Sequence, residues 1–389
     1  MYRKLHLFEY MAILSLSCLI SCGKGKVGND KMMDYPIASR VVTPQGDTLI
    51  TCNFAEVKDT VELHLSTVVD SLEIIKLDKS LKGIRDVTIF GQYIGIDLQN
   101  KGPYHIFMRE GKFVCALQWV EDKTYALADY QISEKSGKVY LLPWVKEKIM
   151  VFDLKGNRLQ DIPLPTRLNK GGFVVDEEKR QVAVVQMAFE GENAPGAWLQ
   201  DFEGKVIHQI KSSALEIYPD YSNEVNISVH GKKYISYAIV YPCIYNEQTD
   251  TLYHYFFDEN ILQPRLVINR DEIVGGVSIH EFPSFYLSTV YEKDFKNVGT
   301  IYIDKKTLKG GRYVIKNDLL AGIPLDGMLK EEGFVAHATA AEWKKAVTKR
   351  LQEGYGTLSP ETRAFLNDWQ IRTSKDEDDF VYVFFGRYK

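Results

Sequence analysis

Cysteine is scarce in this chain, and what there is has no arrangement suited to zinc or thiol redox chemistry. The 389 residues include five cysteines, with no CxxC pair and no Cys/His spacing typical of a zinc site. Beyond residue 22 only Cys52, Cys115 and Cys243 remain, so at most one disulfide can form among them. Because Cys115 and Cys243 lie in apolar, strand-like runs, we expect buried free thiols there.

Several catalytic and binding motifs are also missing. There is no Gly-x-Ser-x-Gly nucleophile elbow and no glycine-rich phosphate loop. The formal net charge of −4 lacks the basic excess on which nucleic-acid binding usually depends. The sequence therefore gives no indication of a nucleotide cofactor or a nucleic-acid partner, and we expect no cofactor.

The N-terminus has the pattern of a bacterial lipoprotein signal. Arg3 and Lys4 precede an apolar run over about residues 10–20, which has the length of a signal peptide and is too short to span a membrane. The run ends in Leu-Ile-Ser-Cys, at residues 19–22. We expect cleavage of residues 1–21 and lipid on Cys22. The alternative is an ordinary signal peptide cut after Ser21, which would leave a soluble protein.

Residues 22–55 are expected to form a lipidated tether. The segment that follows Cys22 is rich in glycine and lysine and has little that could build a core. It also lacks an acidic run soon after the cysteine, which marks many surface-displayed lipoproteins. We therefore expect an outer-membrane lipoprotein and favour the periplasmic face over the cell surface.

Units of two apolar strands around a turn recur about every fifty residues. The clearest turns contain Gly111, Gly156 and Gly204, at spacings of 45 and 48 residues, with looser copies near Asn260 and Lys305. Glycine and asparagine accept the positive φ that short β turns often need. A period of 40–55 residues leaves room for four short strands, as in a β-propeller blade. Six such units can be counted, which predicts an all-β, six-bladed propeller over residues 56–389.

The last unit contains a predicted helical insertion over about residues 339–372. Thr339 and Glu342 fit a capping box, and Ser359-Pro360 begins a second helix. The apolar run 380–385 then predicts a final strand. Because an open ring would leave unpaired edges, we expect the N-terminal segment 61–66 to supply the outer strand of the last blade.

These features, in this order, resemble the six-bladed β-propeller lipoproteins typical of Bacteroidetes, which are similar in fold to TolB-like and NHL-like propellers. The resemblance rests on the lipobox, the lead-in at 61–77, the Phe-Asp-x-x-Gly type hairpins, the helical insertion and the ending at 380–385, and it covers about residues 55–389. It implies no established reaction and no catalytic residues.

Aspartates near the predicted inner strands are the first candidates for a site. Asp86, Asp129 and Asp176 could reach a central pocket, where two carboxylates can act as acid and base in glycoside hydrolysis. The alternative is that they are turn and strand-end residues. The seven histidines beyond the signal are spread almost one per unit, so an axial metal site is geometrically possible. Surface and strand positions are the simpler explanation, and we expect no metal site.

Aromatic residues around the second unit are the other candidates. Trp119, Tyr130 and Trp144 would suit stacking on a sugar or peptide, unless they pack between blades. Together with Asp86 and Asp129 they form the predicted ligand site.

We therefore expect a monomeric, lipid-anchored module of the cell envelope that binds a glycan or protein without catalysis. One alternative is a propeller hydrolase or lyase acting on a carbohydrate or lactone in the axial pocket. Another is a structural envelope protein that docks through the helical insertion.

Overall fold

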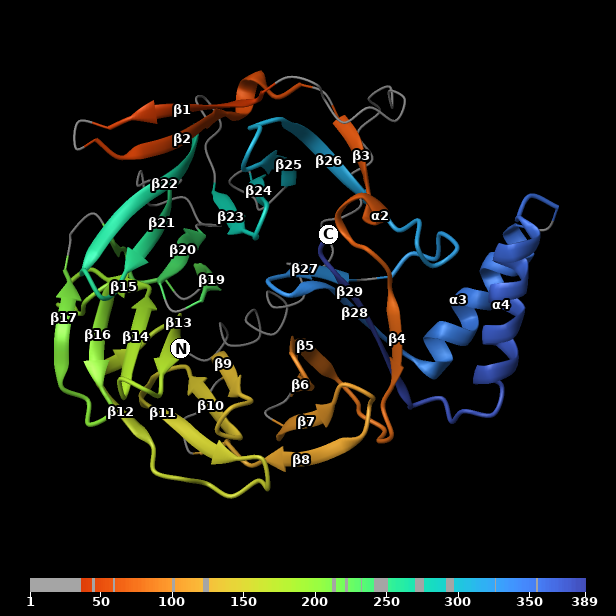
Figure 1. The fold of residues 1–389 in the computed structure, drawn as a ribbon, viewed down its shortest axis with the longest axis horizontal. Helices are drawn as coiled ribbons and strands as arrows, with labels where there is room; N and C mark the ends of the chain where they lie inside the picture. Colours follow the sequence, from red (N-terminus) through yellow and green to blue (C-terminus); the bar gives the residue numbers. More distant parts are fainter. Residues whose placement is uncertain are drawn as a thin grey trace, which may run out of the picture.

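The computed structural model is a ring of six β-sheets around a central axis (Figure 1). It describes residues 36–389 except 44–45, 59, 100–101, 122–125, 212–214, 221–222, 232, 241–250, 270–275, 292–296, 326 and 355. The predicted six-bladed propeller is confirmed. In each blade the strand that comes first in the repeat lies nearest the axis, so β5, β9, β13, β19, β23 and β27 surround the centre.

The first three blades are simple four-stranded antiparallel sheets. Blade 1 contains β5 (Ile84–Phe90), β6 (Tyr93–Leu98), β7 (Tyr104–Met108) and β8 (Phe113–Leu117). Blade 2 contains β9 (Leu127–Ser133), β10 (Lys138–Pro143), β11 (Lys146–Asp153) and β12 (Ile162–Leu168). Blade 3 contains β13 (Gly171–Asp176), β14 (Gln181–Gln186), β16 (Ala197–Asp201) and β17 (Val206–Ile210), with β15 (Ala188–Phe189) and β18 (Glu216–Ile217) paired in parallel beside it.

The other three blades each recruit strands from the N-terminal segment. Blade 4 contains β19 (Glu224–His230), β20 (Tyr234–Val240), β21 (Thr251–Phe256) and β22 (Ile261–Asn269), extended by β2 (Thr48–Asn53) and β1 (Ala38–Val42). Blade 5 contains β23 (Val277–Glu281), β24 (Phe285–Tyr291), β25 (Asn297–Asp304) and β26 (Gly310–Lys316), extended by β3 (Thr60–His64). Blade 6 contains β27 (Gly327–Lys330), β28 (Gly333–Thr339), β29 (Val381–Arg387) and β4 (Glu73–Lys76).

Ring closure does join the two ends of the chain, but through a different strand from the one predicted. Residues 61–64 lie in β3, which pairs in parallel with β26 and so belongs to blade 5. The short helix α2 (Leu65–Val68) then carries the chain to β4, which pairs antiparallel with β29. Ile75 of β4 is 4% exposed and packs with Val383 and Phe385. The outer strand of the last blade is therefore 73–76 and not 61–66.

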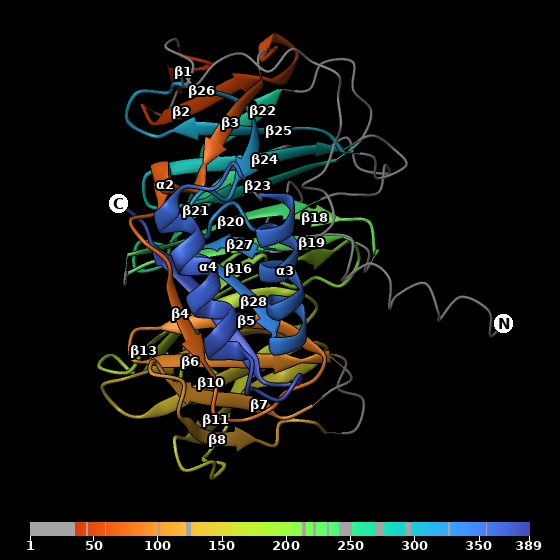
Figure 2. The same ribbon diagram turned by 90° about the vertical axis from the view of Figure 1, so that its right-hand side faces the viewer.

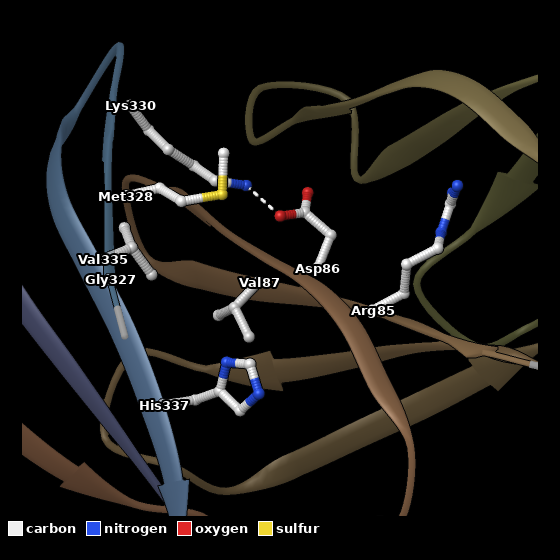
Figure 3. A pocket seen from close by; sticks show the side chains of 8 residues that line it. All are labelled: Arg85, Asp86, Val87, Gly327, Met328, Lys330, Val335 and His337. Carbon is white, nitrogen blue, oxygen red and sulfur yellow. Dashed lines mark hydrogen bonds and ion pairs between the residues drawn. The ribbon is translucent and has the colours of Figure 1, made fainter. Parts of the chain in front are cut away.

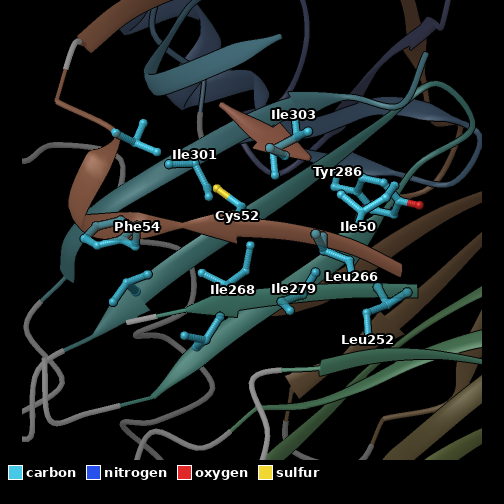
Figure 4. Packing of buried hydrophobic residues seen from close by; sticks show 14 of the residues in the cluster. Ile50, Cys52, Phe54, Leu252, Leu266, Ile268, Ile279, Tyr286, Ile301 and Ile303 are labelled. Carbon is cyan, nitrogen blue, oxygen red and sulfur yellow. The ribbon is translucent and has the colours of Figure 1, made fainter. Parts of the chain in front are cut away.

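Part of the segment predicted as tether belongs to the propeller. Strand β2 pairs in parallel with β22, and its Ile50 and Cys52 point into the core of blades 4 and 5 (Figure 4). Phe54, in the 3-10 turn η2 (Phe54–Glu56), is fully buried in the same cluster. The alternation of buried positions along β2 is the pattern of a strand with one face on a core. The propeller thus includes residues well before residue 56.

The predicted helical insertion is confirmed as α3 (Ala340–Glu353) and α4 (Pro360–Thr373), which lie outside the ring beside blade 6 (Figures 1 and 2). The capping box forms as expected: the Glu342 backbone amide donates to Thr339 Oγ1 at 3.2 Å and the Thr339 amide donates to Glu342 Oε2 at 2.7 Å. Trp343 is fully buried, with its ring 4.9 Å from that of Phe384. This contact attaches the helices to the sheet.

The cysteines of the described part of the chain are unreactive. Cys52 and Cys115 are buried free thiols, and burial raises the pKa of Cys52 to about 12 and that of Cys115 to about 11. Because the thiolate is the reactive form, neither is suited to redox chemistry at neutral pH. Cys22 and Cys243 lie outside the described residues. No helix among the described residues is long and apolar enough to cross a membrane.

The closing strand should contribute strongly to stability. We expect Ile75→Ala to lower the free energy of unfolding by about 2–4 kcal/mol, because it leaves a cavity between the last blade and the first. The control Val42→Ala, at a position 71% exposed on β1, should change it by less than about 0.5 kcal/mol. Urea unfolding followed by fluorescence measures both. Equal effects of the two substitutions would contradict this account of ring closure.

Candidate functional site

A group of polar side chains from three blades meets at the axis around Asp86. Asp86 lies on β5, Tyr130 on β9 and Lys330 at the end of β27. The Tyr130 hydroxyl donates to one oxygen of the Asp86 carboxylate. The Lys330 ammonium donates to the other oxygen, as Figure 3 shows. Thr88 Oγ1 lies 3.2 Å from Lys330 Nζ, from the Tyr130 hydroxyl and from Asp86 Oδ2. We call Asp86, Thr88, Tyr130 and Lys330 the axial group.

Two members of the axial group, Asp86 and Lys330, border a small cavity between the last blade and the first. The cavity measures about 20 Å³, enough for one water molecule or one hydroxyl group. Figure 3 shows Asp86 and Lys330 on one side of it and His337 on the other. Asp86 and Lys330 are 27% and 18% exposed, so both reach solvent.

Asp129 is held next to this group by the backbone of two blades. Its Oδ1 accepts from the Tyr130 amide at 2.8 Å and its Oδ2 accepts from the Phe173 amide at 3.0 Å. Burial raises the pKa of Asp129 to about 7, although the Phe173 amide acts in the opposite direction. Gly172 makes this approach possible, since a Cβ there would lie 2.8 Å from Asp129 Oδ2 and 2.6 Å from Ile227.

One end of the axis is bridged by the turn between β27 and β28. Lys330 reaches Asp86 in blade 1, while the next residue, Glu331, accepts the Val229 amide in blade 4 at 3.2 Å. Blades 1 and 4 lie on opposite sides of the ring, so the turn spans the centre. Burial, together with the nearby charges of Glu332, Asp129 and Glu281, raises the pKa of Glu331 to about 7, although the Val229 amide acts in the opposite direction.

Buried polar groups between blades 1 and 2 support the axial group. Arg85 donates to Asp97 Oδ2 through Nε at 2.6 Å and also through Nη2, and it reaches the Leu127 carbonyl at 3.1 Å. The Tyr104 ring lies 4.9 Å from that of Tyr130. Burial, followed by the charges of Asp86, Asp97 and Asp129, raises the pKa of Tyr104 well above its usual value, so its hydroxyl keeps its proton.

Two atoms in this layer have unmet hydrogen-bonding capacity. Within the described part of the chain, the Tyr104 hydroxyl and Asp97 Oδ1 are buried and have no hydrogen-bond partner. Buried polar atoms normally have one, often an ordered water. The Tyr104 hydroxyl and Asp97 Oδ1 can therefore each form a further hydrogen bond.

The predicted site residues fall into two sets. Asp86 and Tyr130 do come together at the axis, whereas the carboxylate of Asp129, the neighbour of Tyr130 on β9, hydrogen-bonds to the backbone of blade 3. Trp119 is 1% exposed in the core between blades 1 and 2, where its Nε1 donates to the Gly102 carbonyl at 2.9 Å. Trp144 is half-buried, with Lys170 Nζ 4.3 Å from its ring. Asp176 accepts the amides of Glu178 and Lys179, as a turn aspartate does.

Sequence reasoning missed Thr88, Lys330 and Glu331. The signal that could have found the last two is Lys-Glu-Glu-Gly at residues 330–333, a charged turn that ends in glycine after a short apolar stretch. Gly333 has φ of +149° and pairs with Arg387. Among the described residues, no three His, Cys, Asp or Glu side chains are grouped so that they could hold a metal ion.

Comparison with known proteins shows a shared fold but assigns no activity to this chain. Neither a family model nor a curated protein sequence matches the chain. A protein from Bacteroides fragilis whose name describes it as exported has a similar structure, with a TM-score of 0.53, 11% sequence identity, and coverage of 85% of this chain and 100% of that one.

Two lyases are more distant structural neighbours. A streptogramin B lyase has a TM-score of 0.41 at 12% identity, covering 66% of this chain and 76% of its own. A catalytically inactive virginiamycin B lyase from Staphylococcus aureus has a TM-score of 0.40 at 10% identity, covering 64% and 90%. At these identities the likeness to the Bacteroides fragilis protein shows a shared propeller fold alone, and the two lyases carry no argument about this chain.

Proposed function

We propose that this protein is a lipid-anchored module of the bacterial cell envelope that binds a glycan at the axis of its propeller without transforming it. The observation that carries the proposal is the ion pair of Asp86 and Lys330 at one solvent-reaching cavity, while Thr88 and Tyr130 hydrogen-bond to the same carboxylate. A cationic donor beside a carboxylate acceptor can fix the orientation of a sugar hydroxyl.

The size of the cavity limits how a glycan would bind. About 20 Å³ cannot enclose a sugar ring but can take one hydroxyl group. A hydroxyl there would accept from Lys330 and donate to Asp86, while the rest of the glycan lies in the opening. Such a site recognises the end or the edge of a sugar chain.

A second candidate, a hydrolase or lyase, is favoured by the acid–base character of two carboxyl groups. The pKa values of Asp129 and Glu331 are both raised to about 7, and the charge of Asp129 contributes to the shift of Glu331. A carboxyl group that titrates near neutral pH can act as a general acid or base. Turnover of a polysaccharide or lactone with a pH profile near 7 that is lost in Asp129→Asn would favour this candidate over binding alone.

Glycan binding should depend on the axial group. We expect Asp86→Asn and Lys330→Met each to weaken binding by about tenfold or more, because each removes a charge-assisted hydrogen bond. Calorimetry with envelope polysaccharide fragments, on the chain carrying Cys22→Ala, measures the affinity. Asp368→Asn, at a carboxylate 51% exposed on α4, is the matched control and should bind like the parent. No binding to any fragment, or equal binding by all variants, would count against the proposal.

Asp129 should destabilise the fold as the pH rises. Its pKa is raised from 3.8 to about 7 on folding, so its contribution is favourable below about pH 4 and is lost as the pH rises through 7. Asp129→Asn should therefore gain stability relative to the parent between about pH 5 and 8, with a higher melting temperature at the alkaline end. A stability difference that stays constant with pH, as expected for Asp368→Asn, would contradict this.

The lipid anchor can be tested with the two cysteines of the N-terminal segment. In the native bacterial host or a bacterium that processes lipoproteins, Cys22→Ala should lose metabolic labelling by palmitate and leave the membrane fraction. Cys18→Ala should keep both properties, because Cys18 lies inside the predicted signal peptide. Labelling retained by Cys22→Ala would show that the anchor is elsewhere.

A further inference from the structure

A second cleft, larger than the axial cavity, lies on the face of the propeller where the inner strands end. It measures about 340 Å³, within the lower range of small-molecule sites. Its walls come from three neighbouring hairpin turns: Gly91 follows β5, Pro283 follows β23, and Glu331 and Glu332 join β27 to β28. Arg387 and Tyr388, at the end of the chain, complete it.

Arg109 is fixed in one orientation at the edge of this cleft. Its Nη2 and Nε donate to Glu73 Oε2 at 2.8 and 3.2 Å, its Nη1 reaches the Gly91 carbonyl at 3.3 Å, and its guanidinium lies 4.1 Å from the Phe385 ring. Those contacts use three of the five N–H groups of an arginine. A guanidinium that is already oriented loses little freedom when it binds a carboxylate.

The cleft also contains a second cation and two carboxylates. Arg387 is exposed at the end of β29, and its charge and that of Arg109 oppose the rise in the pKa of Glu332 that burial causes. Glu331 lies beside Glu332 in the turn. The cleft therefore brings two cations and two carboxyl groups together within one small volume.

The floor of the cleft is apolar and rigid. Ile89 and Phe385 are each 2% exposed beneath it. Tyr388 is held by a hydrogen bond from its hydroxyl to the Lys330 carbonyl at 2.6 Å and by its ring, edge-on to Phe285 at 5.5 Å. The walls thus exist before a ligand arrives, which limits the entropic cost of binding.

We propose that this cleft binds a short peptide or amino acid with a free ammonium and a free carboxylate, the carboxylate held by Arg109 and Arg387 and the ammonium by Glu331 and Glu332. Arg109 keeps its ion pair with Glu73 in either case. A ligand with one charge would place a new opposite charge at only the arginine end or only the glutamate end of this partly desolvated site. Small apolar side chains would lie on the Phe385 and Ile89 floor. This site shares the turn after Lys330 with the axial group, but it does not depend on the proposed glycan binding.

Three related probes test the charge requirement on the unaltered protein. Dialanine carries both charges, N-acetyl-dialanine lacks the ammonium, and dialanine amide lacks the carboxylate. Titration followed by NMR should show dialanine binding at least about tenfold more tightly than either blocked form. Equal binding of the three, or no binding of dialanine in the millimolar range, would overturn the proposal.

Substitutions then assign the two ends of the ligand. Arg387→Gln should weaken dialanine by about tenfold and leave dialanine amide unaffected, whereas Glu332→Gln should weaken dialanine and leave N-acetyl-dialanine unaffected. Arg372→Gln and Glu353→Gln, at side chains 64% and 58% exposed on the helical insertion, are the matched controls. If the controls weaken dialanine as much as the cleft variants, the ligand binds elsewhere.

Discussion

The pairing of β4 with β29 is the constraint on which the ring depends. Strand β4, four residues long, completes the sheet of blade 6 by pairing with the seven-residue strand β29 near the other end of the chain. Without β4, β29 would present an open edge, and open edges invite pairing with other chains. The parallel pairing of β3 with β26 adds a second connection one blade earlier. Because both connections join segments hundreds of residues apart, closure has a high entropic cost and is expected to come late in folding.

The blades could be predicted from the sequence because each is a local repeat. Turn glycines such as Gly111 and Gly156, flanked by apolar strands, determine their own hairpins, and the capping box at Thr339 forms from residues three apart. The closing strand could not be assigned in the same way. Residues 61–64 and 73–76 are both short apolar segments, and the choice between blades 5 and 6 depends on distant partners. Likewise, β2 has only two buried residues, and its pairing partner β22 lies more than 200 residues away.

The site was predictable to the extent that it follows strand position. Asp86, Asp129 and Tyr130 lie on inner strands, so their approach to the axis follows from the blade repeat. Lys330 ends the four-residue strand β27 and Glu331 lies in the turn that follows. The Lys-Glu-Glu-Gly pattern marks this turn, but no local pattern predicts that the turn spans the centre. Trp119 shows the opposite limit. An indole ring suits stacking on a ligand, but that of Trp119 is buried in the core, where its N–H donates to the Gly102 carbonyl.

The attachment of residues 36–54 to the propeller shortens the segment that would join an N-terminal lipid to the ring. Pro36 already bridges to Lys309, and Ile37 donates to the Leu308 carbonyl, near the outer strands of blade 5. A lipid on Cys22 would then be joined to the propeller by residues 23–35, whose fully extended length is about 45 Å. The disc would be suspended by its rim at no more than about that distance from the bilayer.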